Sequence, residues 1–376
     1  MKLEFTLKQI NRYYIKSHSL LCDSHQKNPV EVVREICGLN AQSARAPYLS
    51  LWGRIEGFKK SELSKALYED KLLIKTWLLR GTVHIVPVQD FTIYQKALQG
   101  YLVERLRRYL KGVSFGLKAN ERVKLHQSIL DELRDASLTK RELLSKVEHL
   151  MRDYRGKEQK IIMFRAIWEL SHQGLICHGK PTGPWYHFKE NRFTSVENWL
   201  SGKEPEGINE AEAKRILLEK YLHSYGPASI QDFAYWTGFR VTDARKILDE
   251  VKDRIVSVKI NDAKGSFLML KEDVDVLNKI DKDMRSVRFL PEFDSIVMGH
   301  KDKSRILNER YRKKVFLPLA SVAPTILQGG RVIGIWNYKF IDKSLTLSPF
   351  RSLGTEEIRK IKRESSQLKQ FLESPD

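Results

Sequence analysis

The clearest pattern of apolar and polar positions lies in the middle of the chain. Residues 229–236 and 241–251 carry apolar side chains at helical spacing, separated by a short turn at Gly238. Glycine favours the left-handed backbone that ends a helix, so this stretch predicts a helix-turn-helix. Residues 254–260 and 266–270 then alternate as two strands around a polar turn. A helix-turn-helix followed by a strand hairpin is a winged helix.

The same order of elements occurs earlier in the chain. Residues 138–147 and 159–173 predict two helices, and residues 175–178 and 185–188 predict the two strands of a wing. A third, less regular instance lies near the start of the sequence. There, helices are expected at about 5–16, 29–40 and 61–69, ahead of a β-branched run at 73–86.

The last ninety residues have a different pattern. Short apolar runs typical of strands follow one another, and Gln328-Gly329-Gly330 predicts a tight hairpin. The strand-like runs cover residues 287–291, 315–319, 323–327 and 331–336. We expect them to form a small antiparallel β-barrel or sheet, followed by a basic amphipathic helix at 355–372.

The sequence therefore predicts an α+β protein with three tandem winged-helix domains, a small antiparallel β-barrel and a C-terminal helix. The expected domains are a first winged-helix-like domain at 1–115, a second winged helix at 116–200, a third at 208–284, and a barrel-like domain with the terminal helix at 285–376. The best linker is at 201–207. A chain of 376 residues is long enough for several domains of this size.

The chain is strongly basic along almost its whole length. Lys and Arg together number 66 against 47 acidic residues, which gives a net charge of +19. Such an excess favours a polyanionic partner, and nucleic acid is the first candidate. Ribosomal, membrane-surface and heparin-type binding would produce the same excess, so charge alone does not name the function.

The cysteines indicate a reducing compartment. Cys22, Cys37 and Cys177 are odd in number and form no CxxC pair, which argues against a disulfide framework and a structural zinc site. The sequence opens without a signal-peptide core and has no run of 18 apolar residues, so we expect a cytoplasmic protein with no membrane partner.

No cofactor is expected either. The sequence lacks a Walker-type glycine loop, a dinucleotide fingerprint and a His-Glu-x-x-His motif. The group His172, Cys177, His178 and His187 straddles a predicted hairpin without paired-ligand spacing, so we predict no metal.

Asn40-Ala41-Gln42 is the strongest candidate for chemistry. Two neutral amides at positions i and i+2 each offer an acceptor oxygen and a donor nitrogen, so together they can hold a water molecule. This pair would support hydrolysis without a metal. The alternative is that the amides cap backbone groups at a helix end or face solvent.

Basic and acidic side chains elsewhere suggest further contacts. Arg80, Thr82 and His84 would share one face of an extended segment and grip phosphate, because strand side chains alternate. A structural role for His84 is the alternative. Asp294 is a candidate general base, unless it organises the turn beside Pro291.

A basic loop follows Asp294 in the sequence. Lys301, Lys303 and Arg305 are predicted to contact phosphate there, or else to form a solvated run of charge.

Several segments together resemble one known family, the AlkZ-like, tandem winged-helix DNA glycosylases. The resemblance runs from about residue 5 to residue 350 in the order of the family. It rests on residues 38–52, 80–84, 225–238, 290–295 and 330–334.

The resemblance implies winged-helix units and a β-barrel around a basic channel for duplex DNA. It also implies a DNA repair enzyme that excises N-alkylated purines, including bulky adducts and interstrand crosslinks. The family's catalytic motif is Gln-x-Gln or Gln-x-Asp where this chain has Asn40-Ala41-Gln42, so the first amide is one methylene shorter here. That change moves the amide back by roughly 1.5 Å.

The implied chemistry needs no strong acid or base. A purine alkylated at N7 or N3 is already cationic and leaves as a neutral base, so the protein has only to orient water against the developing sugar cation. We assign Gln42 to the water and Asn40 to shared positioning of the water or the sugar. Arg45, Arg80 and His84 are candidate contacts to the DNA backbone.

No lysine stands out as a Schiff-base nucleophile, so we predict a monofunctional glycosylase, which does not cleave the strand. It would act on duplex DNA at the nucleoid without an obligatory protein partner. The main alternative is a non-catalytic winged-helix DNA-binding regulator, which would show sequence preference rather than a response to lesions. An RNA-binding or protein-interaction scaffold is the third possibility.

Overall fold

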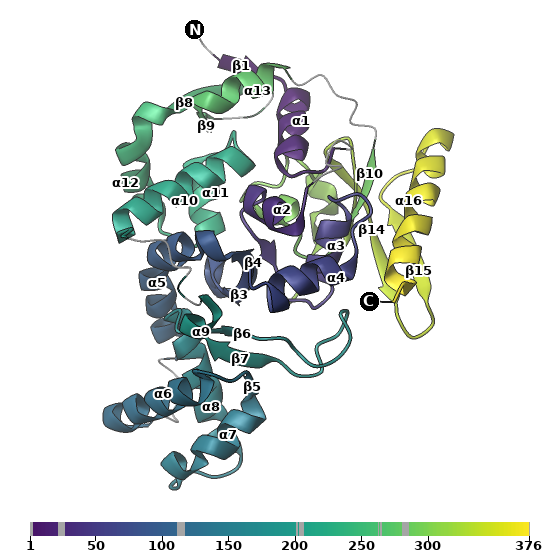
Figure 1. Ribbon diagram of the computed structural model, residues 1–376. Coiled ribbons are helices and arrows are strands. Elements are labelled where there is room, and N and C mark those ends of the chain that lie inside the picture. The colour runs from purple at the N-terminus through teal and green to yellow at the C-terminus, as the bar shows by residue number, and fades with distance from the viewer. Residues whose placement is uncertain are drawn as a thin grey trace. The chain divides into compact units, whose positions relative to one another are not determined.

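The chain divides into two compact units (Figure 1). Unit 1 comprises Met1–Leu63 and Leu218–Asp376, and unit 2 comprises Ser64–Leu217. The computed structural model describes residues 3–21, 27–110, 117–200, 202, 207–261, 263, 265–279 and 286–375. Cys22 and most of the predicted linker at 201–207 lie outside the described residues. The four-domain division stays a prediction.

Unit 1 takes its helices and strands from both of its sequence segments. Its helices are α1 (Leu7–Ser17), α2 (Pro29–Glu35), α3 (Ala46–Trp52), α4 (Lys60–Ser64), α11 (Ile230–Thr237), α12 (Val241–Val251), α13 (Val274–Lys279), α14 (Ser295–Met298), α15 (Arg312–Val315) and α16 (Thr355–Glu373). Its strands are β1 (Leu3–Phe5), β2 (Leu39–Asn40), β8 (Ile255–Ile260), β9 (Phe267–Leu270), β10 (Val287–Leu290), β11 (Phe316–Leu317), β12 (Ser321–Val322), β13 (Thr325–Gln328), β14 (Arg331–Lys339) and β15 (Ser344–Pro349).

Unit 2 is mostly helical. Its helices are α5 (Val88–Leu110), α6 (Ala119–Leu133), α7 (Lys140–Val147), α8 (Lys157–His172) and α9 (Val196–Leu200), and α10 (Glu210–Tyr225) begins in this unit and ends in unit 1. Its strands are β3 (Leu73–Trp77), β4 (Val83–Pro87), β5 (Leu138–Thr139), β6 (Ile176–His178) and β7 (Arg192–Ser195). A π-helical turn, Lys65–Glu69, continues α4. None of the described helices combines the length and the apolar character that a membrane span requires.

The helix-turn-helix predicted in the middle of the chain is confirmed. Ser229 caps α11 through a reciprocal pair of hydrogen bonds with Asp232, and Gly238 ends the helix with a φ of 92°. The Gly238 N–H donates to the Ala234 carbonyl at 2.9 Å, which satisfies a free carbonyl of the last turn. Helix α12 and the antiparallel hairpin β8–β9 follow as predicted.

An unpredicted strand completes this sheet. β1 pairs in parallel with β8, with Leu3 opposite Val258, so the first described residues join a hairpin about 250 positions later. The residues around it form one apolar cluster, composed of Phe5, Ile10, Tyr13, Val258, Ile260, Met269 and Leu277. The N-terminal segment is thereby fixed to the later part of unit 1.

The predicted β-barrel is an open sheet in the described residues. Four antiparallel strands lie in the order β10-β13-β14-β15, and β11 and β12 form a separate pair. About eight strands are needed to enclose a packed interior, and four are too few to close on themselves. Instead, α16 packs against β10 (Figure 1), with Ile361 and Leu368 buried. The tight hairpin at Gly329 and the predicted terminal helix are confirmed.

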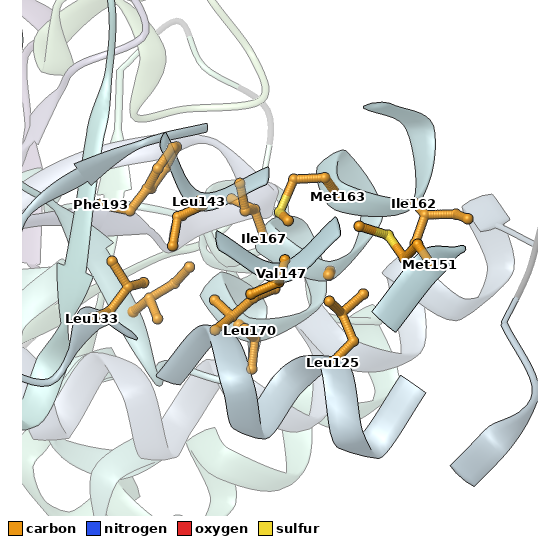
Figure 2. Close-up of a cluster of buried hydrophobic side chains, with 13 residues drawn as sticks. Leu125, Leu133, Leu143, Val147, Met151, Ile162, Met163, Ile167, Leu170 and Phe193 are labelled. Atoms are coloured by element: carbon orange, nitrogen blue, oxygen red, sulfur yellow. The ribbon is translucent and has the colours of Figure 1, made fainter. Parts of the chain in front are cut away.

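Unit 2 has its own core between α6, α7, α8 and the small sheet β5-β7-β6. Figure 2 shows the side chains of this cluster pointing toward one another, with Leu143 and Leu170 among them. Both leucines are fully buried. Removing such a side chain from a packed core costs roughly 2–5 kcal/mol, so this cluster stabilises the segment.

One strand of unit 2 was predicted at the wrong place. The partner of β6 is β7, with Ile176 opposite Ser195, and not the predicted run at 185–188. That run lies in a turn, where the His187 N–H donates to the Pro184 carbonyl at 3.0 Å. Gly183 at a φ of 102° and two nearby prolines bend the chain there, which overrides the strand preference of the aromatic residues.

Candidate active site

The Asn40-Ala41-Gln42 segment lies in a sharp loop of unit 1 rather than at a helix end. Helix α2 stops at Glu35, and the chain reverses at Cys37 and Gly38, which have φ values of 56° and 98°. The predicted helix at 29–40 is therefore too long, because these two left-handed residues break it. Asn40 ends the short strand β2, and α3 begins at Ala46.

Asn40 and Gln42 are bonded to each other. Nδ2 of Asn40 donates to Oε1 of Gln42 at 3.1 Å, and Oδ1 of Asn40 accepts from the Gln42 backbone N–H at 3.1 Å. Asn40 is 8% exposed, whereas Gln42 is exposed. The two amides thus contact one another directly, and the Gln42 Nε2 group makes no protein hydrogen bond in the described part of the chain. That donor remains for a water or a ligand.

The carboxylate of Glu292 lies against the same loop. Oε1 of Glu292 accepts from the Ser43 hydroxyl at 2.5 Å and from Nε of Arg45 at 3.0 Å. The Arg45 and Glu292 side chains are 17% and 12% exposed, so the pair is largely shielded from water. Arg45 also donates to the Tyr338 carbonyl at 3.5 Å. Its predicted contact with the DNA backbone stays a prediction, and it would compete with these bonds.

Asp294 is a structural residue and not the general base suggested by the sequence. It forms a fully buried ion pair with Arg54, with Nη2 of Arg54 2.7 Å from Oδ1 and Nη1 2.8 Å from Oδ2. It also accepts from the Ser50 hydroxyl at 2.9 Å and caps α14 through the Ile296 N–H. A carboxylate with all its acceptor positions engaged by protein donors has none left for water.

Arg80, Thr82 and His84 do not form one extended face. The chain turns between β3 and β4, with Arg80 at a φ of 55°, and Trp77 pairs with Val83 across the hairpin. The Thr82 hydroxyl donates to the Leu79 carbonyl at 2.9 Å, which closes the turn. The expectation of a continuous strand is wrong, because a positive φ at Arg80 and at the following glycine reverses the chain.

His84 is enclosed within unit 2. It is 4% exposed, and its Nδ1 lies 2.9 Å from the Thr82 carbonyl oxygen. Burial lowers the pKa of His84 to about 4, so the imidazole is neutral at pH 7. A neutral buried ring gives no charge to a phosphate, and the alternative structural role suits it better.

Two of the three cations in the predicted phosphate loop are buried. Lys303 is 2% exposed and donates to the Met298 and His300 carbonyls, and its Nζ lies 4.9 Å from the Tyr235 ring centroid. Arg305 is 8% exposed and bonds to the Pro227 carbonyl and the His300 ring.

Only Lys301 of the three is exposed. The alternative of a solvated charge run is therefore wrong for Lys303 and Arg305, whose charges are satisfied inside unit 1. Their burial argues equally against phosphate contact, whereas phosphate contact by the exposed Lys301 stays a prediction.

The histidine and cysteine group has an internal explanation. His178 is buried in unit 2 and stacks on Trp77 at 4.4 Å between ring centroids. Burial lowers the pKa of His178 well below its usual value and raises that of the Cys177 thiol, which is also fully buried. Within the described ranges, no three His, Cys, Asp or Glu side chains come together as a metal-binding group.

Sequence reasoning missed Glu292 and Ser43 as parts of the site. Nothing local distinguishes Glu292, which stands 249 positions from its partner Ser43. A tertiary contact of this separation leaves no trace in hydrophobic periodicity. Only the grouping of residues 290–295 with residues 38–52 as two conspicuous segments pointed toward it.

Comparisons with known proteins agree on one group. The family model described as DNA glycosylase AlkZ-like matches residues 33–371. An interstrand DNA cross-link repair glycosylase from Streptomyces sahachiroi is 24% identical over 357 residues, which covers 91% of this chain and 90% of the relative. The solved structure of the Streptomyces sahachiroi DNA glycosylase AlkZ aligns with a TM-score of 0.79 at 21% identity, covering 99% of this chain and 97% of the other.

Proposed function

This chain belongs to the AlkZ-like DNA glycosylases, and from that premise we propose that it hydrolyses the N-glycosidic bond of alkylated purines in duplex DNA. Gln42 holds the attacking water, and Asn40 orients Gln42. The preferred lesions carry the alkyl group at N7 or N3, bulky adducts and interstrand crosslinks among them. The relative whose name specifies interstrand cross-link repair supports that range.

The observation that carries this proposal is the Asn40–Gln42 pair. The bond from Asn40 Nδ2 engages Oε1 of Gln42, which leaves the exposed Gln42 Nε2 group for a water or a sugar oxygen. Pre-organised polar groups of this kind contribute most when they need no reorganisation during the reaction. Asn40 therefore acts as a holder of Gln42 rather than as a second, equal water ligand.

The leaving group explains why neutral amides suffice. An N7- or N3-alkylated purine carries a positive charge, and breaking the bond to C1′ returns the electron pair and neutralises the ring. Unmodified purines need an acid to leave, and Gln42 and Asn40 supply none, so undamaged DNA is spared. The intact, neutral base leaves when this bond breaks. Water then adds to C1′ of the sugar cation and gives up one proton to solvent, which leaves an abasic site in an uncleaved strand.

DNA binding follows from the charge and from the helix-turn-helix elements. A net charge of +19 favours the phosphate backbone, and each of the three helical segments that precede a hairpin serves as a winged-helix unit. Phosphate contacts position a duplex without reading its sequence, which suits an enzyme that must find lesions in any context. We infer a cytoplasmic enzyme that works at the nucleoid.

The test is base release from a duplex that contains a single N7-methylguanine or a nitrogen-mustard crosslink. The wild-type chain is compared with Gln42→Ala and with Gln367→Ala, an exposed glutamine of α16 that serves as the matched control. We expect release by the wild type and the control, and a rate at least about 100-fold lower for Gln42→Ala. Absence of release by the wild type from both substrates would favour the non-catalytic DNA-binding regulator.

A further inference from the structure

Glu292 is the one carboxylate that contacts the Gln42 loop directly in the described part of unit 1. A single oxygen, Oε1, accepts both the Ser43 hydroxyl and Nε of Arg45, at 2.5 and 3.0 Å. Ser43 follows Gln42 in sequence, and Arg45 follows two positions later. The carboxylate therefore anchors the backbone immediately after the proposed water-binding amide.

The second oxygen of Glu292 raises the cost of this arrangement. Oε2 is buried and has no hydrogen-bond partner among the described residues. A buried acceptor without a donor destabilises the folded state, and more so when it is charged. The Ser43 and Arg45 bonds offset this cost because hydrogen bonds to a charged group are stronger than neutral ones.

The segment that carries Glu292 is itself held firmly. Two residues further on, Asp294 forms the buried ion pair with Arg54. Next to it, the Ser295 hydroxyl donates to the Gly38 carbonyl at 2.9 Å, just before the site loop begins. The loop at residues 38–45 is thus bonded near both of its ends to residues 292–295. Movement of Glu292 would be transmitted to Gln42 through Ser43 and Arg45.

We propose that Glu292 is a positioning residue for base excision, which fixes the direction of the Gln42 amide by holding Ser43 and Arg45. The inference rests on the proposed function, because it assigns Glu292 a part in that reaction. This role depends on the length of the Glu292 side chain, because one carboxylate oxygen must lie within hydrogen-bond distance of both donors at once. A shift of the Gln42 amide by about 1 Å is enough to slow the chemistry by about 100-fold.

Two substitutions of Glu292 separate the effect of side-chain length from the effect of charge. Glu292→Gln keeps the side-chain length and an acceptor oxygen but loses the charge, whereas Glu292→Asp keeps the charge but is shorter by roughly 1.5 Å. We expect Glu292→Gln to retain the single-turnover rate of N7-methylguanine release within about 10-fold of the wild type. Glu292→Asp should be slower by about 100-fold.

The readouts distinguish positioning from general stability. Single-turnover rates are measured at saturating protein, and the duplex Kd and the free energy of unfolding in urea are measured in parallel. A positioning role lowers the rate while the Kd stays within about threefold and both variants remain folded under the assay conditions. Glu4→Gln, at an exposed carboxylate on β1, is the matched control.

A second variant keeps the test decisive if a Glu292 variant fails to fold. Ser43→Ala removes one donor and leaves the carboxylate paired with Arg45. We expect it to slow release by about tenfold, and Glu292→Asp should add less than its full effect in that background, since the two residues act through one bond. Full additivity would overturn the proposal. If Glu292→Asp does not fold, a wild-type rate of release by Ser43→Ala overturns it instead.

The outcomes also separate this inference from the proposed function. If Glu292→Asp released the base faster than Glu292→Gln, the charge of residue 292 would matter rather than its side-chain length, and the positioning role would be overturned. Wild-type release with unchanged rates in all Glu292 and Ser43 variants would refute the inference alone. If the wild-type chain released no base from either damaged duplex, both the proposed function and this inference would be refuted.

Discussion

Asn40 holds Gln42 by two hydrogen bonds of equal length, from its Nδ2 to the Gln42 side-chain oxygen and from the Gln42 backbone N–H to its own oxygen, each 3.1 Å long. The second bond is a turn between residues i and i+2 that a short Asn side chain makes readily. A side chain longer by one methylene overshoots it. The asparagine at this position is thus adapted to its loop.

Asn40 variants test that adaptation. Asn40→Ala removes both bonds, and Asn40→Gln breaks the turn, so each should slow N7-methylguanine release by about 10- to 100-fold. Single-turnover base release at saturating protein is the measurement, with the duplex Kd as the control for binding. A faster reaction in Asn40→Gln would contradict the adaptation and would mean that the shorter amide impairs the wild-type site.

The buried pair of Arg54 and Asp294 is predicted to carry stability rather than catalysis. Asp294→Ala leaves the guanidinium charge buried and unpaired, which should lower the free energy of unfolding by roughly 3–5 kcal/mol. Urea denaturation measures it. Arg359→Ala is the control, because its ion pair with Glu356 on α16 is exposed and screened by water, so its loss should change the free energy of unfolding little. Similar losses in the two variants would count against the buried pair.

Lys301 and Lys303 are expected to behave in opposite ways. Lys301→Gln should reduce the slope of log K against log salt for duplex binding by about 0.9, which is the contribution of one phosphate contact. Lys303→Met should leave that slope unchanged and lower the free energy of unfolding, because its ammonium group is satisfied inside unit 1. The test is a salt titration of binding; a reduced slope for Lys303→Met would overturn the structural assignment.

We predict that the buried His18 lowers the free energy of unfolding in acid. It is fully buried between the Tyr14 and Tyr225 rings, and neither ring nitrogen has a partner among the described residues. Burial holds the pKa of His18 well below its usual value of 6.5, and the charges of Arg54 and His300 lower it further. The unfolded chain therefore binds a proton below pH 6.5 that the native state excludes.

The sign of this linkage fixes the experiment. Above pH 6.5, His18 does not make the free energy of unfolding depend on pH. Below pH 6.5, the free energy of unfolding falls by about 1.4 kcal/mol per pH unit, because the unfolded chain binds one proton that the native state excludes. His18→Phe should reduce the pH slope of the unfolding free energy between pH 6.5 and 5 by about that amount. Gln367→Ala, which changes an exposed side chain without an ionisable group, is the control and should leave the slope unchanged. An identical slope in wild type and His18→Phe would refute the assignment.

Local signals in the sequence predicted several elements well. Helix α12 has the bounds expected from its apolar spacing, and Gly238 ends α11 as predicted, because caps and helical periods involve neighbours in the chain. The terminal helix α16 was foreseen for the same reason. Such elements depend on interactions within a few residues, and these are what a single sequence displays.

The roles of the charged residues depended on distant partners instead. Asp294 meets Arg54 across 240 positions, and Lys303 is enclosed by aromatic rings from other segments. A lysine on a surface and a lysine inside look alike in sequence, because composition does not tell whether carbonyl oxygens surround the charge. For that reason the sequence does not show that Lys303 and Arg305 are buried, nor that Glu292 contacts the loop that carries Gln42.

The pairing of β1 with β8 has a consequence for synthesis of the protein. Translation proceeds at about 5–20 residues per second, and about 250 residues separate β1 from β8, so β1 leaves the ribosome roughly 12–50 s before its partner strand exists. During that interval Phe5, Ile10 and Tyr13 have no apolar cluster to enter. Unit 2 is contiguous in sequence and can form its core in the meantime. The nascent N-terminal segment is therefore a natural target for chaperones.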